Sequence, residues 1–431
     1  MRRPAPAAAV ALLLAAATAT APAAEPPREP RGPLPLESSC VACHSQLDGP
    51  VKEPADRAPE DVHFLKGLGC SDCHGGNPAA GADGDMDAAH DRTKGFAGRP
   101  ARLGIPAFCA RCHADAVFMK RFDPHARVDQ LAEYRTSVHG RKNAEKDERA
   151  AVCTDCHGVH GIRAVSDPRS SVHPSRVADT CGRCHADPSL MGRYFIPTNQ
   201  LEEYRTSVHA AALHERGDLS APTCNDCHGS HGAVPPGVEH VTNVCGSCHS
   251  REAGLFRETE LKRGLDLTAC IQCVVCHGNH AVLKPTPAML GVGEGSTCTG
   301  CHAEGEEEYA AAERMARSAA ALTDRLREAS ELLDRAEQAG VEVGPDRFEL
   351  QKARDSLVEA RVLVHAFDLE RYQTATGAGL AVADGGVAAG RRAFTELRHR
   401  RAGLLLSLVV IAAVIAGLVI KIRSIEQGSP P

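Results

Sequence analysis

The chain has 431 residues, of which 43% are hydrophobic, 24% are charged and only 3% are aromatic. Aromatic side chains usually supply much of the apolar area of a protein core, so this composition argues against a conventional α/β enzyme. The formal net charge of −6 argues against the basic surface that binds nucleic acid. The unusual residues are cysteine and histidine, with 19 and 22 copies.

The N-terminal segment has the pattern of a secretory signal peptide. Two arginines precede an apolar run from Ala7 to Ala17, and Ala21–Ala23 is an A-x-A cleavage site, which predicts that residues 1–23 are removed. The apolar run is too short to span a bilayer; an uncleaved anchor is the alternative. Residues 24–39 are predicted to be a Pro-rich linker.

Cysteine occurs in a repeated pattern, because Cys-x-x-Cys-His appears nine times over residues 40–302 and uses 18 of the 19 cysteines. This is the attachment motif of c-type haem, in which two thiols bind the porphyrin and the histidine binds the iron from one side. Zinc ribbons also use Cys-x-x-Cys, but they need no histidine at that position. The sequence therefore predicts nine covalently bound haem c groups that form the core of residues 40–302, and without haem this region should not fold.

The attachment residues follow directly from the motifs. The predicted haem-binding cysteines are Cys40, Cys43, Cys70, Cys73, Cys109, Cys112, Cys153, Cys156, Cys181, Cys184, Cys224, Cys227, Cys245, Cys248, Cys273, Cys276, Cys298 and Cys301. The predicted proximal iron ligands are His44, His74, His113, His157, His185, His228, His249, His277 and His302. Cys270 is left over and is predicted to be a free thiol.

Each iron has a second axial position, and further histidines are available to fill it. The predicted distal candidates are His139, His160, His209, His231, His280, His63, His90, His125, His173, His240 and His365. The first five stand in repeated segments, either in EYRTSVH or three residues after a proximal histidine in CHGxH. For every candidate the alternative is a solvated or hydrogen-bonded histidine, and His214 and His399 are predicted to be surface residues.

The haem region contains internal repeats. The segment LAEYRTSVH at residues 131–139 returns as LEEYRTSVH at residues 201–209, and each copy is followed by CxDCHGxHG and later by CGxCH. This order predicts one single motif at Cys40 and then four motif pairs, which begin at Cys70, Cys153, Cys224 and Cys273.

After residue 302 the composition shifts to alanine, glutamate, arginine and leucine with heptad spacing. Residues 303–401 are predicted to form a helical stalk, with antiparallel helices over about 306–338 and 346–374 and a third, Gly-broken helix from about 378. Residues 402–420 contain no charge over 19 positions, about 28 Å of helix, and are predicted to span the membrane. A buried core helix is the alternative. Residues 421–431 are then a cytoplasmic tail, and the bulk of the chain is predicted to lie in the periplasm at the inner membrane.

The haem region resembles the periplasmic multihaem c-type cytochromes with doubled CxxCH motifs. The pattern CxDCHGxH…CGxCHAD and the SVHG-type helix carry this resemblance, and the long helices are similar to those of the hydroxylamine-oxidoreductase and nitrite-reductase-like branch. The resemblance implies a mainly α fold with much irregular structure, closely stacked haems and distal ligands that are mostly histidine. The chain departs from the nitrite reductases in having no CxxCK motif.

These features predict an electron carrier fixed to the inner membrane. It would relay electrons between a quinol-oxidising or other redox subunit in the membrane and periplasmic acceptors. The alternative is an oxidoreductase that acts on a small nitrogen or sulfur oxyanion at a haem with an open axial position.

Overall fold

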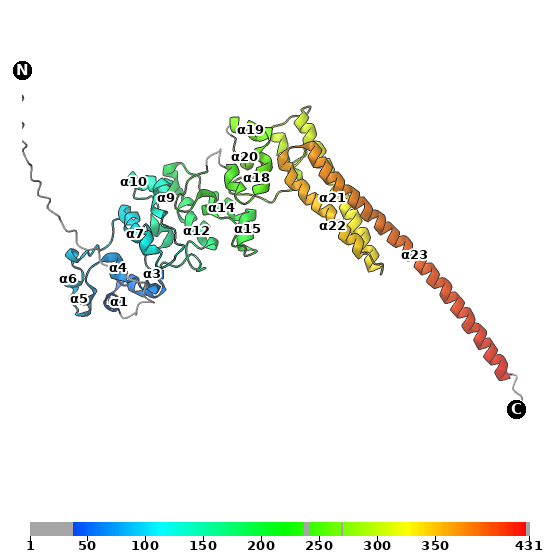
Figure 1. Ribbon diagram of the computed structural model, residues 1–431, viewed down its shortest axis with the longest axis horizontal. Coiled ribbons are helices and arrows are strands. Elements are labelled where there is room, and N and C mark those ends of the chain that lie inside the picture. Colours follow the sequence, from blue (N-terminus) through cyan, green and yellow to red (C-terminus); the bar gives the residue numbers. More distant parts are fainter. Residues whose placement is uncertain (1–37, 237–240, 269, 428–431) are drawn as a thin grey trace, which may run out of the picture. The chain divides into compact units, whose positions relative to one another are not determined.

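The computed structural model describes residues 38–236, 241–268 and 270–427 (Figure 1). Helices make up 67% of the structure, and these ranges contain no strand. The predicted mainly α fold with irregular connections is therefore confirmed. The proposed signal peptide, nearly all of the linker, the candidate ligand His240 and the last four residues lie outside the described residues.

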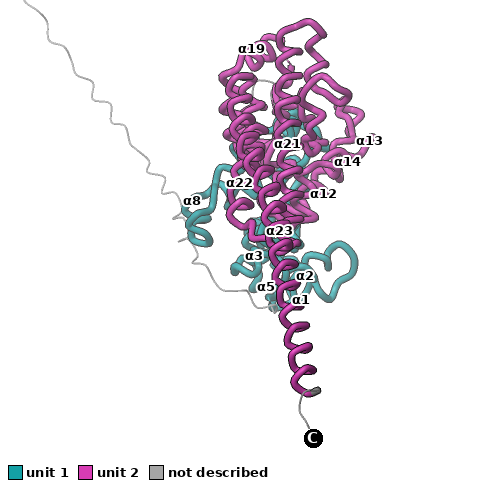
Figure 2. The backbone as a smooth tube through the Cα atoms, turned by 90° about the vertical axis from the view of Figure 1, so that its right-hand side faces the viewer, with its two compact units in different colours: residues 1–170 teal, residues 171–431 magenta. Residues whose placement is uncertain are grey.

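The chain divides into two compact units, residues 1–170 and 171–431 (Figure 2). The first unit carries the first four CxxCH motifs, and the second carries the other five and the long helices. The helices of the first unit are α1 (Ser39–His44), α2 (Glu53–Arg57), α3 (Val62–Leu65), α4 (Cys70–His74), α5 (Pro78–Ala82), α6 (Met86–Ala89), α7 (Ile105–His113), α8 (Ala116–Met119), α9 (Gln130–Thr136), α10 (Val138–Ala144) and α11 (Cys153–His157).

The second unit begins with short helices of the same kind. They are α12 (Pro174–His185), α13 (Pro188–Met191), α14 (Gln200–Arg205), α15 (Val208–His214), α16 (Cys224–His228), α17 (Val241–Gly246), α18 (Ser250–Arg257), α19 (Glu260–Leu267) and α20 (Gln272–His277). Three long helices follow, α21 (Glu307–Gln338), α22 (Gly344–Leu363) and α23 (Leu369–Gln427), with the 3₁₀ turn η9 (Val364–Ala366) after α22.

The CxDCH motifs form their own one-turn helices, because the aspartate satisfies a backbone amide that a helix start leaves without a partner. Asp155 accepts a hydrogen bond from the Val152 amide at 2.6 Å, and Asp226 accepts one from the Thr223 amide at 2.8 Å. The glycine after each histidine then ends the helix, as Gly158 does with a φ of +80°. This left-handed conformation is one that glycine adopts without strain, and it turns the chain away from the proximal histidine.

The repeated EYRTSVH segments are held by the same two contacts in both copies. Tyr134 donates a hydrogen bond to the Ala151 carbonyl at 2.9 Å, and Tyr204 donates one to the Pro222 carbonyl at 3.0 Å. Each acceptor lies two residues before the first cysteine of a CxDCH motif. The buried serines Ser137 and Ser207 cap the helices α10 and α15, which carry His139 and His209. The repeat therefore fixes a histidine-bearing helix to a haem motif.

The long helices have the only extensive hydrophobic core among the described residues. Figure 1 shows α21, α22 and α23 side by side, and thirteen buried residues, including Leu322, Leu333 and Leu350, form one cluster between them. The clusters of the haem region are smaller, for example the four residues Val41, Ala55, Ala58 and Phe64. A region whose core is formed by haem needs few buried side chains, so this difference agrees with the predicted haem core.

The second and third long helices differ from their predicted bounds. Helix α22 ends at Leu363, earlier than predicted, and Phe367 in the turn that follows has a left-handed φ of +50°. Helix α23 then runs without a break through the glycines that suggested an interruption. Three of these glycines are packing positions, since a Cβ on Gly379, Gly386 or Gly390 would lie 2.6–3.1 Å from side chains of α21 or α22.

Alanine substitutions at two glycines of α23 should therefore change stability in opposite directions. At Gly390 a Cβ would lie 2.6 Å from the Leu332 Cβ, whereas at the exposed Gly385 it would meet nothing within 4 Å. We expect Gly390→Ala to destabilise the stalk by about 1–3 kcal/mol through overpacking. Gly385→Ala should stabilise it by up to about 1 kcal/mol through helix propensity. Thermal unfolding of the detergent-solubilised protein, followed by circular dichroism, checks both; equal shifts would contradict this packing.

Among the described residues, α23 is the helix that is long and apolar enough to cross a membrane, by length and composition. Its apolar part is exposed over the whole window from Leu404 to Ile420. This exposure argues against the alternative of a buried core helix.

Candidate haem sites

All 19 cysteines lie within the described residues, and each is a free thiol rather than part of a disulfide. Most of the motif cysteines stand in one of the short helices, with the adjacent histidine at the end of the same helix, as in α4, α11, α16 and α20. Two motifs are exceptions. In the seventh, α17 ends at Gly246, before Cys248 and His249. In the ninth, Cys298 begins a single 3₁₀ turn, η8 (Cys298–Gly300). Cys270, which belongs to no motif, is exposed.

Six of the nine proximal histidines face a second histidine ring. The ring-centroid distances are 6.1 Å for His44 and His90, 5.9 Å for His113 and His63, 6.2 Å for His74 and His160, 6.5 Å for His249 and His209, 6.1 Å for His228 and His280, and 6.0 Å for His277 and His365. Each pair joins one motif histidine to one of the distal candidates.

The spacing of these rings fits an iron between them. A metal–imidazole bond is about 2 Å long, and the ring centroid lies about 1 Å behind the nitrogen, so two imidazoles on one iron have centroids about 6 Å apart. The observed distances of 5.9–6.5 Å agree with this value, whereas contacting aromatic rings often lie closer, from about 4.5 Å. The residues present therefore fit a haem with two histidine ligands.

Hydrogen bonds and burial prepare several of these rings for binding iron. The Nδ1 atoms of His44, His74 and His228 are hydrogen-bonded to the carbonyls of Val51, Gly98 and Val234, at 2.8, 2.9 and 3.1 Å. These contacts occupy Nδ1 and leave Nε2 available as the ligand atom. Burial lowers the pKa values of His160, His209, His277 and His280, which favours the neutral imidazole that binds metals.

The pairs follow the internal repeats. His160 and His280 each stand three residues after a proximal histidine, yet they face His74 and His228, which belong to earlier CxDCH motifs. The glycine turn after the proximal histidine explains this, because it directs the following histidine to another motif. His231 occupies the same position in the repeat, and His139 occupies the position of His209.

The structure places several other histidines differently. His125 is exposed. His173 is buried and caps α12, and its Nδ1 lies 2.8 Å from the Ser175 hydroxyl. The ring of His302 has no second histidine ring against it among the described residues, and its Nδ1 lies 3.3 Å from a carboxylate oxygen of Glu306. His214 and His399 are exposed, as predicted for surface residues.

Consecutive motifs contact each other through their cysteines. The first cysteines interact by hydrogen bonds in the pairs Cys40–Cys70, Cys109–Cys153, Cys181–Cys224 and Cys245–Cys273. The first of these contacts lowers the pKa of Cys40 to about 6. The second cysteines interact electrostatically in Cys73–Cys112, Cys227–Cys248 and Cys276–Cys301. The motif pairs predicted from the sequence repeats correspond only to contacts between second cysteines. Taken together, the contacts between first cysteines and those between second cysteines connect the motifs in chain order within each unit.

The stalk contributes directly to one site. His365 lies in η9 and faces His277, while Leu255 and Leu290 of the haem region pack on the stalk residues Met315, Leu363 and Tyr372. Arg251 of α18 forms an ion pair with Glu359 of α22. The stalk is therefore joined to the last haem motifs by apolar, ionic and histidine contacts.

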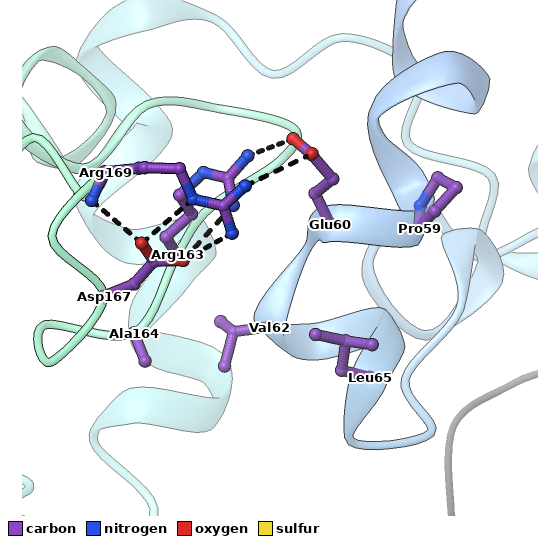
Figure 3. Close-up of a pocket in the computed structure, with 8 residues that line it drawn as sticks. All are labelled: Pro59, Glu60, Val62, Leu65, Arg163, Ala164, Asp167 and Arg169. Atoms are coloured by element: carbon purple, nitrogen blue, oxygen red, sulfur yellow. Dashed lines mark hydrogen bonds and ion pairs between the residues drawn. The ribbon is translucent and has the colours of Figure 1, made fainter.

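The first unit also holds a cavity of about 230 Å³ between α3 and the loop that follows His160 (Figure 3). Its charged lining residues form ion pairs with one another: Arg163 with Glu60 and Asp167, and Arg169 with the same two carboxylates. A cavity whose charges are already paired has no free group to recognise a charged substrate. These ion pairs hold the His160 loop against α3.

Sequence reasoning used only the histidine of the EYRTSVH repeat and missed residues that position it. The repeated tyrosine and serine were a visible signal for this role. Arg102 had no such signal, although its guanidinium binds Asp155 with contacts of 3.1 and 2.8 Å. Asp61, which contacts His63, also had none.

Comparison with known proteins gives two curated relatives. The C-type polyheme cytochrome OmcC of Geobacter sulfurreducens is 22% identical over 217 residues, which cover 44% of this chain and 26% of the relative. The multiheme cytochrome MtrA of Shewanella baltica is 23% identical over 193 residues, which cover 42% of this chain and 51% of the relative. This chain is a relative of the multihaem c-type cytochromes. The relationship supports covalently bound haem c and an electron-transfer role for the cytochrome.

The chain spans about a quarter of one of these relatives and about half of the other. No family model and no solved structure matches this chain.

Proposed function

We propose that the chain is a nonahaem c-type cytochrome that is anchored to the inner membrane and relays electrons in the periplasm. Its partners are a quinol-linked redox subunit in the membrane and periplasmic electron acceptors. The observation that carries the proposal is the set of six histidine pairs at about 6 Å, each of which includes a histidine from a CxxCH motif. When bound, each haem supplies an iron that takes up and releases one electron.

The residues of each site have separate roles in this proposal. The two cysteines fix the porphyrin to the chain, and at the six paired sites the motif histidine and its partner hold the iron from both sides. Iron ligated on both sides has no position for a substrate, which favours electron relay over chemistry on a small molecule. The neighbouring cysteines of successive motifs support a continuous path, because they bring consecutive attachment sites into contact within each unit.

The apolar segment at residues 402–420 supports the membrane anchor. It is continuous with the stalk in helix α23 and is flanked by Arg400 and Arg401 before it and Lys421 and Arg423 after it. The segment contains no histidine, so it offers no ligand for a haem within the membrane. Electrons from a quinol would therefore have to enter through a partner subunit.

A haem count tests the proposal. Intact mass and a pyridine haemochrome assay on the purified, exported protein should give nine haems per chain. The control is a variant in which Cys298 and Cys301 are both alanine, which should give eight. A wild-type count well below nine, or a colourless protein that contains zinc, would contradict the proposal.

A further inference from the structure

Asp61 is a buried carboxylate that contacts two histidine-bearing segments far apart in the sequence. One oxygen, Oδ1, accepts a hydrogen bond from the His63 amide at 2.8 Å and lies 3.0 Å from the His63 Nδ1. The other, Oδ2, accepts hydrogen bonds from the amides of Gly161 and Ile162 at 2.8 and 3.0 Å. These amides directly follow His160. A single carboxylate therefore joins the segments of two distal candidates.

The surrounding contacts make this junction rigid. The Val62 amide donates to the Ile162 carbonyl at 2.7 Å, next to the contacts of Asp61. Figure 3 shows the neighbouring pocket, where Arg163 and Arg169 form ion pairs with Glu60 beside Val62. Asp61 itself is only 9% exposed, so water cannot replace its hydrogen bonds.

The two segments serve different predicted haems. His63 faces His113 of the third motif, and His160 faces His74 of the second motif. The charge of Asp61 acts on Cys73 and His160, which belong to the second site. Its Oδ1 lies 3.0 Å from the Nδ1 of His63, which belongs to the third site. The influence of Asp61 therefore reaches both sites.

We propose that Asp61 is a positioning residue shared by the second and third haems, which orients both distal histidines and lowers the potentials of both irons together. This inference rests on the proposed function, because it takes His63 and His160 as iron ligands. A carboxylate on the Nδ1–H of a ligand histidine makes the imidazole a stronger donor, and this favours ferric iron. The negative charge near both sites acts in the same direction.

Asp61 differs from the Nδ1 partners of five other histidines, and it is more buried than the carboxylates near His280 and His302. The Nδ1 atoms of His44, His74, His90, His228 and His365 are each within 3.1 Å of a neutral backbone carbonyl. His63 instead has an ionised, buried partner. Replacing Asp61 by asparagine keeps the shape of the side chain and removes the charge. One of its two acceptor oxygens becomes an NH2 donor, so it accepts hydrogen bonds on one side only.

Asp61→Asn in the full haem-loaded protein tests the proposal by spectroelectrochemical titration. Two haems should move to more positive midpoint potentials, with the remaining haems and the haem count unchanged. The conservative variant Asp61→Glu should restore a negative charge and return the potentials toward wild type. Asp218→Asn is the matched control, because Asp218 makes a similar turn with Ser220 on the surface and should move no midpoint.

Unchanged midpoints, a shift of one haem only, or a uniform shift of all haems would overturn the proposal. If Asp61→Asn does not yield fully loaded protein, Ile162→Pro decides instead. This variant removes one amide donor from Oδ2 and leaves the His63 contact in place. It should therefore change the midpoint potential of one haem. An unchanged midpoint potential would overturn the shared role. A low haem count in the wild-type protein would refute the proposed function instead, so the two failures are distinguishable.

Discussion

Replacing His209 by alanine should leave every haem attached but convert one of them from low-spin to high-spin iron. His209 faces His249 at a centroid distance of 6.5 Å and is the partner that the structure gives to the seventh motif. Alanine offers no ligand, so the iron keeps only His249 and gains an open position. Electron paramagnetic resonance of the oxidised protein should show a new high-spin ferric signal, and the reduced protein should bind one more carbon monoxide per chain than wild type.

His214→Ala provides the matched control for this prediction. His214 ends the same helix, α15, and is exposed. The variant should therefore keep the wild-type spectrum and carbon monoxide stoichiometry. A low-spin spectrum in His209→Ala would contradict the assigned ligand. Carbon monoxide binding by the wild-type protein would show an open haem, which is the requirement of the alternative function, an oxidoreductase for small oxyanions.

The attachment motifs could be read from the sequence because their chemistry is local. Two thiols and one histidine within five residues must meet one porphyrin, so spacing alone identifies them. The partner of each proximal histidine is a long-range choice, and no constant offset relates the two. His90 faces a histidine that precedes it by 46 positions, whereas His365 faces one that precedes it by 88.

The distal candidates show where a repeat helps and where it does not. The CHGxH pattern marked His160 and His280 as candidates, but it could not show that they face the rings of earlier motifs. His173 also looked available in the sequence, yet the structure uses it to cap a helix. Asp61 is a single residue with no repeat and no motif, and its role depends on amides 100 and 101 positions away.

The stalk was predictable in outline because heptad spacing reports helices that pack together. Its details depended on tertiary contacts that spacing does not contain. Glycine lowers helix propensity, which suggested a broken third helix. In the structure, close approach to α21 and α22 favours a small residue at Gly379, Gly386 and Gly390, and the packing outweighs the propensity.

The protein produced without haem should retain its stalk and lose the structure of the haem region. The buried clusters between residues 38 and 302 are small, as in the group of Ala212, Leu213 and Ala221, whereas the stalk cluster contains thirteen buried residues. A region with so little apolar contact cannot offset the conformational entropy lost on folding. We expect trypsin to cleave residues 38–302 at least about 100-fold faster than in the haem-loaded protein, which corresponds to a loss of about 3 kcal/mol.

Mass spectrometry of the digest measures this difference, because a protected fragment should begin near Glu307 and include α21, α22 and α23. Circular dichroism should show that these three helices persist. The comparison is the haem-loaded protein under the same conditions, and the eight-haem variant at Cys298 and Cys301 should be affected only near the last site. A haem-free region that resists trypsin would contradict the inference that haem forms its core, since the stability would then have to come from the polypeptide alone.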